Sequence, residues 1–487
     1  MKEDSFGYDT FLSPFTWRYG SREMRLLFSE RSRRSTWRKV WLELARAESE
    51  FELLSKDELR GIEANSTEGS VDIARAHELE RKIRHDLMAE LRTFAEQAGR
   101  EGGGGKLHLG ATSMDIEDNA DVLIFRKALD LLLTRLVNCL AATRENVVKY
   151  EAMVCMAWTH LQPAEPTTLG YRFANYAQDL MLDIEMLEFV RDRFVKGKGM
   201  KGAVGTSASF EKLLGGEDAV SRLEKKVMGA LGLDYFPVST QTYPRKVDYF
   251  VLSCLTSIAA SCHKFGLDLR VLQSPTFGEL SEPMEELQVG SSAMPFKKNP
   301  VNAERMCSLA RLVAAYPSVG FSNAANNILE RTLDDSANRR VAIPEAFLAV
   351  DECLTIYERL VRGLKVYPAM IEKNLEKFGP FAGTEAVMMK LVEKGGDRQE
   401  VHELIRVESF RAWDEVMQDR PNPLAKMLSE NREISSKLRP AEIRKLLDPR
   451  HHTGDAGLRC ERLVKELIDP ILARHSKRIG ISSKVEY

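Results

Sequence analysis

The chain has 487 residues, of which 44% are hydrophobic and 29% are charged, and its formal net charge is −2. At roughly 100–200 residues per domain, this length predicts two to four domains with a substantial buried core. The balanced charge gives no support to a nucleic-acid-binding protein or to one held on an anionic membrane surface, so any polyanion must be bound locally.

The first residues, MKEDSFGYDT, contain acids and no apolar stretch, and they do not resemble a secretory signal. The sequence contains no run of about 18 uninterrupted apolar residues, so it predicts no membrane span. The seven cysteines are dispersed and form no Cys-x-x-Cys pair, which disfavours a disulfide framework or a thiolate zinc site. We expect a soluble, cytoplasmic protein with reduced thiols.

Proline-free stretches predict long helices, and no proline occurs within 15–162, 167–236 or 245–274. Inside the first stretch, apolar residues with the spacing of one helix face are Leu129, Leu132, Leu133, Leu136, Val137 and Leu140. Residues 169–195 and 247–272 have a similar character. Because strand-like alternation and Asn-Gly turns are nearly absent, we predict an all-α protein with a bundle of long helices.

Two positions suggest domain boundaries. The four glycines at 102–105 disfavour any regular element, and a second boundary is plausible near 366–368. We therefore predict an N-terminal helical domain at 1–112, a central bundle at 113–365 and a C-terminal helical domain at 366–487. These boundaries are placed to about ±10 residues.

The segment 290–300, Gly-Ser-Ser-Ala-Met-Pro-Phe-Lys-Lys-Asn-Pro, cannot be the interior of a helix because of its two prolines. Consecutive backbone N–H groups of the Gly-Ser-Ser turn, with Lys297 nearby, could bind a carboxylate or a carbanion-enolate. Composition alone favours a structural surface loop over such a binding site.

This segment resembles the signature loop of the fumarase/aspartase superfamily, usually written GSSxMPxKxNP. Further segments resemble the adenylosuccinate lyases of the eukaryotic type: 84–89, 108–113, 158–164, 241–248 and 329–340. The resemblance extends from Arg18 to at least Arg406. It implies three all-helical domains whose central bundles form a homotetramer with shared active sites. It also implies a cofactor-free β-elimination that releases fumarate from adenylosuccinate to leave AMP, and commonly from the succinylcarboxamide ribonucleotide of purine synthesis.

His160 lies between an expected helix end and Pro163, where a neutral histidine bonded to the backbone is the ordinary alternative. The resemblance implies a general acid, and an imidazole can donate a proton to a departing amine at neutral pH. Ser291 would otherwise serve only the turn. By resemblance it is the base that removes the proton beside a carboxylate, activated by Lys297 and the N–H groups of the loop.

The remaining candidates are expected to bind the nucleotide. Arg84, His85 and Asp86 form a polar cluster in a stretch expected to be helical, where a solvated face is the alternative, and His85 is also a catalytic candidate by resemblance. Arginines suit a substrate with two carboxylates and a phosphate, because guanidinium groups form paired hydrogen bonds with such anions. The further positions that match the family are Arg18, Tyr19, Thr112, Ser113, Gln241, Arg305, Arg331, Ser336 and Arg340.

Four alternatives receive less support. The glycine-rich segment 197–205 lacks the spacing of a phosphate-binding loop, and the pair His451–His452 lacks a favourable metal-ligand spacing, so we predict no metal. Argininosuccinate lyase belongs to the same superfamily, but 84–86 and 329–340 favour a purine nucleotide. A non-catalytic relative, like some lens crystallins, is disfavoured by the retention of Ser291 and His160. Departures from the expected pattern, at Glu90, Ala203, Val204, Ser207 and Pro244, leave the details of the pocket open.

Overall fold

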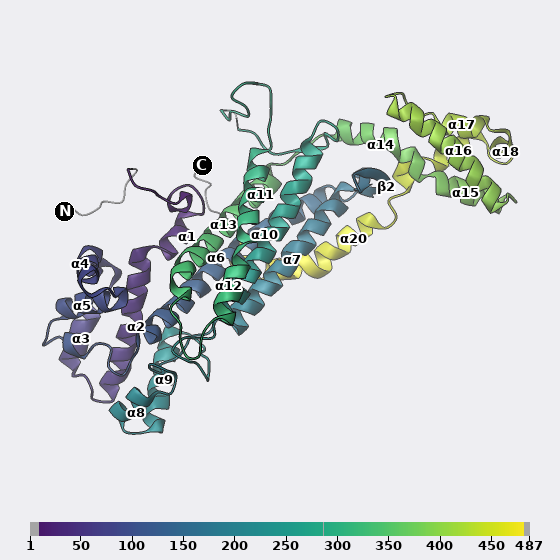
Figure 1. Ribbon diagram of the computed structural model, residues 1–487. Helices are drawn as coiled ribbons and strands as arrows, with labels where there is room; N and C mark the ends of the chain where they lie inside the picture. Colours follow the sequence, from purple (N-terminus) through teal and green to yellow (C-terminus); the bar gives the residue numbers. More distant parts are fainter. Residues whose placement is uncertain (1–8, 286, 482–487) are drawn as a thin grey trace.

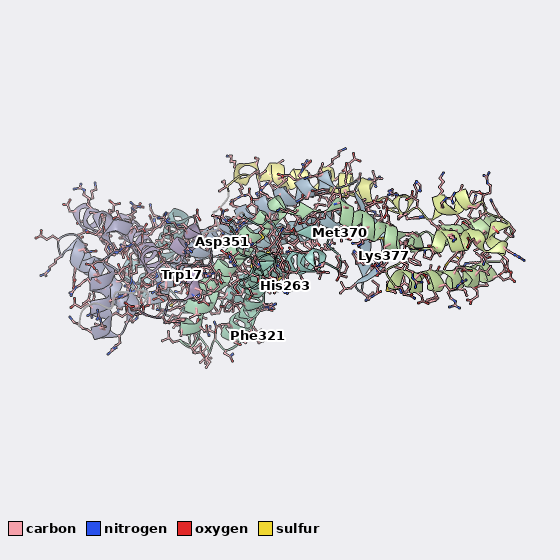
Figure 2. All side chains as sticks on the ribbon, turned by 90° about the horizontal axis from the view of Figure 1, so that it is seen from above. Trp17, His263, Phe321, Asp351, Met370 and Lys377 are labelled. Carbon is pink, nitrogen blue, oxygen red and sulfur yellow. The ribbon has the colours of Figure 1, made fainter. Side chains whose placement is uncertain are left out.

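The computed structural model describes residues 9–285 and 287–481 as an elongated, mostly helical molecule (Figure 1). A long central bundle lies between a small N-terminal group of helices and a C-terminal group at the opposite end. Seen from above, Trp17 and Lys377 lie on the two sides of this bundle (Figure 2).

The N-terminal group consists of one long helix and four shorter ones, most of which begin at a serine or aspartate that accepts a hydrogen bond from the first turn. The helices are α1 (Arg22–Leu27), α2 (Glu30–Glu50), α3 (Lys56–Ala64), α4 (Ile73–Ile83) and α5 (Asp86–Ala98). The four glycines 102–105 allow close packing: a Cβ atom on Gly102 would lie 2.1 Å from the carbonyl oxygen of Ala98. The segment is therefore a tight turn, and it ends in a single 3₁₀ turn, Gly104–Lys106.

The central bundle contains the longest helices of the chain. They are α6 (Ser113–Lys149), α7 (Leu169–Arg193), α10 (Lys246–Gln273) and α13 (Asp335–Gly363), and the shorter helices α11 (Val301–Val313) and α12 (Tyr316–Ala325) pack with them. Two smaller helices, α8 (Ala208–Leu214) and α9 (Glu217–Leu231), connect α7 to α10. The predicted helices at 169–195 and 247–272 are confirmed. All six apolar residues predicted for one face between 129 and 140 are fully buried in α6.

The expectation of an all-α chain is corrected by two small antiparallel sheets. Strand β1 (Val154–Thr159) pairs with β2 (Gln162–Thr168), and β3 (Leu280–Ser281) pairs with β4 (Lys365–Val366). The prolines of β2 contributed to the wrong prediction. A ribbon of two strands has only edge strands, where a missing N–H group is tolerated.

The C-terminal group has a hydrophobic core of its own, formed by residues between Val387 and Leu447. Its helices are α14 (Pro368–Ala382), α15 (Thr384–Glu393), α16 (Arg398–Met417), α17 (Leu424–Glu430), α18 (Arg432–Ser435) and α19 (Pro440–Leu446). The chain then returns: α20 (Ala456–Leu463) and α21 (Asp469–Arg474) pack on the central core, with α20 beside α7 (Figure 1). The boundaries at 112 and 365 stay predictions.

Helix α10 is long and apolar enough to cross a membrane by length and composition alone. It packs against α7, α11, α12 and α13, so its apolar residues belong to the core of the bundle. All seven cysteines are buried and unpaired, which agrees with the expected reduced thiols.

Glu48 gives a first testable expectation, because its buried side chain in α2 raises the pKa of the carboxyl from 4.5 to about 8. Between these values the folded chain holds a proton that the unfolded chain has lost, so stability falls as the pH rises. Glu48→Gln should remove this slope. The unfolding free energy of Glu48→Gln relative to wild type should increase by about 3 kcal/mol from pH 5 to pH 8. Thermal unfolding scans at several pH values would measure this difference. An advantage that stays constant with pH would contradict the assignment.

Candidate active site

The start of α5 and the start of α6 bring His85 and Ser113 together at one end of the bundle. The segment 84–86 is a break between two helices and not the continuous helix that we expected: Arg84 ends α4 with a φ of 60°, and His85 is the N-cap of α5. His85 Nε2 lies 3.5 Å from the hydroxyl of Ser113. Because His85 lies at this break and not inside a helix, its imidazole is exposed.

Arg340, in the first turns of α13, connects to this group by donating a hydrogen bond of 2.6 Å to Asp86. Burial of Asp86 favours its neutral form, but Arg340 outweighs this effect and lowers the pKa of the carboxyl. The Asp86–Arg340 ion pair therefore joins the N-terminal group of helices to the central bundle.

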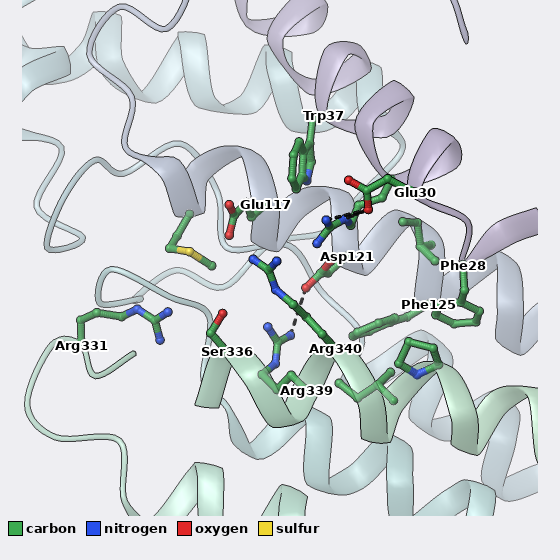
Figure 3. A pocket seen from close by; sticks show the side chains of 15 residues that line it. Phe28, Glu30, Trp37, Glu117, Asp121, Phe125, Arg331, Ser336, Arg339 and Arg340 are labelled. Carbon is green, nitrogen blue, oxygen red and sulfur yellow. Dashed lines mark hydrogen bonds and ion pairs between the residues drawn. The ribbon is translucent and has the colours of Figure 1, made fainter. Parts of the chain in front are cut away.

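A cavity of about 300 Å³ opens beside this ion pair between α2, α6 and α13 (Figure 3). Three predicted nucleotide-binding residues, Arg331, Ser336 and Arg340, line it. Sequence reasoning missed several other lining residues, namely Arg33, Trp37, Glu117, Asp121 and Arg339. The helical spacing of charged residues could have indicated a charged face on α6 and another on α13. It could not have indicated that these two faces meet at one cavity.

Buried ion pairs hold Arg331 in place. The guanidinium of Arg245 donates to Asp118 at 3.0 Å and to Asp335 at 2.6 Å, and Asp335 also accepts from Arg331 at 2.8 Å. Arg245, Asp118 and Asp335 are almost completely buried. Gln241 joins the same end of the bundle, because its backbone N–H donates to the carbonyl of Glu330.

The glycine-rich segment 197–205 is tied to the start of α6 through Asp115. This buried carboxylate accepts hydrogen bonds from the backbone N–H groups of Thr112, Lys201 and Gly202, and it pairs with the Lys198 ammonium. The N–H groups of Lys201 and Gly202 are thus engaged by a carboxylate of the protein. Glu90, which departs from the family pattern, is also structural, because it is buried between Arg34 and Arg38.

A second group of predicted site residues lies beside a later part of α13, on other segments of the chain. It consists of Arg18, Tyr19 and Arg305. The backbone N–H of Gly20 donates to Glu352, and Arg305 lies 4.0 Å from the same carboxylate. Glu352 follows Arg340 by twelve residues, which is about 18 Å along a helix. This group is therefore separate from the cavity.

The signature loop projects from the bundle beside α11 (Figure 1). The hydroxyl of Ser291 accepts hydrogen bonds from the backbone N–H groups of Ala293, at 3.4 Å, and Met294, at 3.1 Å. Asn299 donates to the carbonyl of Gly290 and closes the loop. Such N–H groups favour negative charge on the serine oxygen. Lys297 is exposed in the same loop.

His160 lies at the tip of the β1–β2 hairpin, not beside a helix end as we expected. The strands pair at Thr159 and Gln162, so His160 and Leu161 form a two-residue turn, with φ values of 56° and 59°. Such turns need positive φ at both positions and usually contain Asn-Gly. Non-glycine residues held in this conformation carry strain, which is common at functional sites. Both side chains are exposed.

Helix lengths separate these groups within one chain. The 37 residues of α6 span about 55 Å, with Ser113 at one end and the hairpin of His160 beyond the other. The 28 residues of α10 span about 42 Å between the Gln241 segment and the end at which Gln273 contacts Lys298 of the signature loop. One chain therefore does not bring His160 and Ser291 to His85.

A buried clamp, missed by sequence reasoning, holds the hairpin on the bundle. Arg172 of α7 donates to the carbonyl of Met156 in β1 at 2.7 Å and to Glu279 at 3.0 Å. Glu279 is fully buried and also accepts from Asn374 of α14. Because the carbonyl of Met156 and the carboxylate of Glu279 lie on different segments, the Arg172 guanidinium fixes the direction of the hairpin.

Arg172→Lys should therefore lower kcat by about tenfold with little change in KM, because an ammonium cannot reproduce both contacts and the tip of the hairpin would shift. Steady-state kinetics would measure the effect. Arg193→Lys is the matched control, since Arg193 is exposed at the far end of the same helix. A variant with unchanged kcat would show that the clamp does not position His160.

Among the described residues, no group of three or more histidine, cysteine, aspartate or glutamate side chains has the arrangement of a metal site. His452, considered above as a ligand, contacts the carbonyl of Leu446 through Nε2 at 2.7 Å. The side chains gathered around the cavity are instead suited to binding anions.

Comparison with known families places the chain among lyases. Residues 21–314 match the lyase family, and residues 380–463 match the adenylosuccinate lyase C-terminus. The adenylosuccinate lyase of Schistosoma mansoni is 37% identical over 98% of this chain and 99% of its own length. That of Saccharomyces cerevisiae is 39% identical over 97% and 98%.

Solved structures agree with the fold. A fumarate lyase from Mesorhizobium sp. BNC1 superposes with a TM-score of 0.81 at 25% identity, covering 92% of this chain and 99% of its own. A 3-carboxy-cis,cis-muconate lactonizing enzyme from Pseudomonas putida gives 0.83 at 25% identity, covering 95% and 99%. With relatives of this similarity over nearly its whole length, the chain belongs to the adenylosuccinate lyase family.

Proposed function

We propose that this lyase eliminates fumarate from adenylosuccinate to give AMP, and also from the succinylcarboxamide ribonucleotide to give the aminoimidazole carboxamide ribonucleotide. The observation that carries the proposal is the full-length similarity to adenylosuccinate lyases together with the group of arginines at the cavity. A nucleotide substrate requires both a phosphate site and a carboxylate site, which guanidinium groups provide. The same similarity supports a role in purine synthesis, and a cytoplasmic location is part of the proposal.

Ser291 is the base in this proposal. Its oxygen takes the proton from the succinyl carbon next to a carboxylate, and the electron pair stays on that carbon as a carbanion-enolate. The N–H groups of Ala293 and Met294 support this role, because they stabilise the ionised serine oxygen. Lys297 supplies further positive charge to the loop and to the carbanion.

His160 is the acid. The electron pair of the carbanion forms the double bond of fumarate while the carbon–nitrogen bond breaks, and the imidazolium gives its proton to the departing nitrogen. The exposed position of His160 at a constrained turn supports this role, because a rigid tip can place the imidazole against a substrate bound elsewhere.

The nucleotide would lie at the end of the bundle that contains the cavity. Arg84, His85, Asp86, Ser113, Gln241, Arg331, Ser336 and Arg340 would bind it there, with Thr112 as the N-cap of α6. Arg18, Tyr19 and Arg305 form a second group near Glu352. In the proposed assembly this second group is contributed by another subunit.

The assembly is a homotetramer with shared sites. About 55 Å of α6 lies between His85 and the His160 hairpin, so these residues can act on one substrate only when different chains contribute them. Antiparallel packing of two bundles places the end of one against the start of the other, which supplies this geometry.

An ultraviolet assay with purified protein tests the proposal. Adenylosuccinate and the succinylcarboxamide ribonucleotide should both be cleaved, while argininosuccinate, the substrate of the nearest rival within the superfamily, should not. Cleavage of argininosuccinate without cleavage of either purine nucleotide would replace the proposed substrate class and leave the elimination chemistry in place.

A further inference from the structure

The cavity between α2, α6 and α13 contains one carboxyl that no other described side chain pairs with, that of Glu117. The other carboxylates of the cavity wall are engaged: Glu30 accepts from Arg33 at 2.7 Å, and Asp121 accepts from Arg339 at 3.1 Å. An acidic side chain that is largely surrounded by protein must either find a partner or remain protonated. Glu117 is therefore available to a partner from outside the chain, and without one its protonated form is favoured.

Glu117 is placed where a bound nucleotide can reach it. It follows Ser113 by one turn of α6, on the same face, and Asp121 lies one turn farther. Ser336 and Arg340 of α13 form the opposite wall. Figure 3 shows the carboxyl of Glu117 and the guanidinium of Arg340 directed into the same space.

The surroundings of Glu117 favour its neutral form. Burial disfavours the carboxylate most, Asp86 and Asp121 add negative charge, and Arg340 opposes them, so that the pKa rises from 4.5 to about 8. The other charged groups that line the cavity are Glu30 and Arg33 of α2, Asp121 of α6, Arg331, and Arg339 and Arg340 of α13, and Asp86 and Asp118 act on Glu117 from outside the lining.

Building on the proposed function, we propose that Glu117 is a further substrate-positioning residue, whose neutral carboxyl donates a hydrogen bond to an anionic oxygen of the nucleotide held by Arg340. A carboxylic acid has one O–H donor, which complements the donors of a guanidinium around a phosphate or carboxylate group. The ionised form has no donor and places a negative charge beside the anion. Substrate binding should therefore weaken as Glu117 loses its proton.

Steady-state kinetics across pH 6.5–9.5 would test this role with wild type, Glu117→Gln and the control Glu385→Gln, which changes an exposed residue of α15. In wild type and control, KM for adenylosuccinate should rise by about fivefold from pH 8 to pH 9. Glu117→Gln keeps a donor and cannot ionise, so its KM should stay flat above pH 7.5. A variant that retains the wild-type rise in KM would overturn the proposal.

Calorimetry of AMP binding to the whole wild-type protein at pH 8.5 gives a test that needs no variant. Measured in two buffers of different ionisation enthalpy, binding should take up most of one proton, because the phosphate of AMP is already ionised at this pH and Glu117 regains its proton on binding. Glu117→Gln should take up none. Zero uptake by the wild type refutes the role of Glu117, whereas failure of the wild type to cleave adenylosuccinate refutes the proposed function.

Discussion

Ser291→Ala is expected to abolish fumarate release while leaving nucleotide binding nearly unchanged. Removing the base deletes a group that acts only in the reaction, and general base catalysis accounts for about 10²–10⁴-fold in rate, so kcat should fall by at least that factor. We expect several arginines at the other end of the bundle to bind the nucleotide, with Arg331 held by Asp335 and Arg340 by Asp86. Single-turnover assays and calorimetry with AMP would measure the two effects separately.

The matched control for this variant is Ser435→Ala, which removes an exposed hydroxyl from the C-terminal group of helices and should retain wild-type kcat. If Ser291→Ala also fails to bind AMP, then Ser291 has a structural role in the loop. If its kcat stays within tenfold of wild type, another group is the base.

Mixing two inactive variants is expected to restore activity. His160→Ala and Ser291→Ala chains each lack one group, and we expect the two groups at one site to come from different subunits. When equal amounts are co-refolded at random, about a quarter of the sites receive both native residues, because two independently drawn chains must each be native at the required position. The recovered activity should therefore be about a quarter of wild type, with the wild-type KM.

A control mixture separates complementation from contamination. Ser291→Ala chains refolded with chains that carry both substitutions leave every site without a base, so they should stay inactive. Native mass spectrometry must show that hybrid tetramers have formed in both mixtures. Hybrids of the two single variants that remain as inactive as their parents would refute sharing of the site between subunits.

The long helices could be predicted because their signal is local. Proline-free stretches and a repeating apolar face determine α6, α7 and α10 independently of what packs on them, and the burial of residues 129–140 agrees with this. The return of α20 to the bundle could not be predicted, because its short amphipathic helix would fit equally well on the C-terminal core.

The hairpin and the helix break at 84–86 escaped prediction for a common reason. His160, Leu161 and Arg84 adopt positive φ without glycine or asparagine, so the residues that usually mark such a conformation are absent. Only tertiary contacts, such as those of Arg172 and Glu279 beneath the hairpin, hold the chain in this form.

Some residues of the candidate site could be predicted from the sequence and others could not. Family resemblance pointed to Ser113, Ser336 and Arg340, and the structure places them at one end of the bundle with Asp86. The resemblance could not point to Glu117. The proposed role of this residue depends on the arginines of α13, more than two hundred residues away in the sequence, and on none of them forming an ion pair with it.

The most direct test of the central claim is product analysis by proton NMR after adenylosuccinate is incubated with exhaustively chelated protein and no added cofactor. We expect AMP and fumarate in equal amounts at the rate of the untreated protein, because in the proposed mechanism Ser291, Lys297 and His160 supply the chemistry. Absence of fumarate, or activity that returns only with a particular divalent ion, would contradict it.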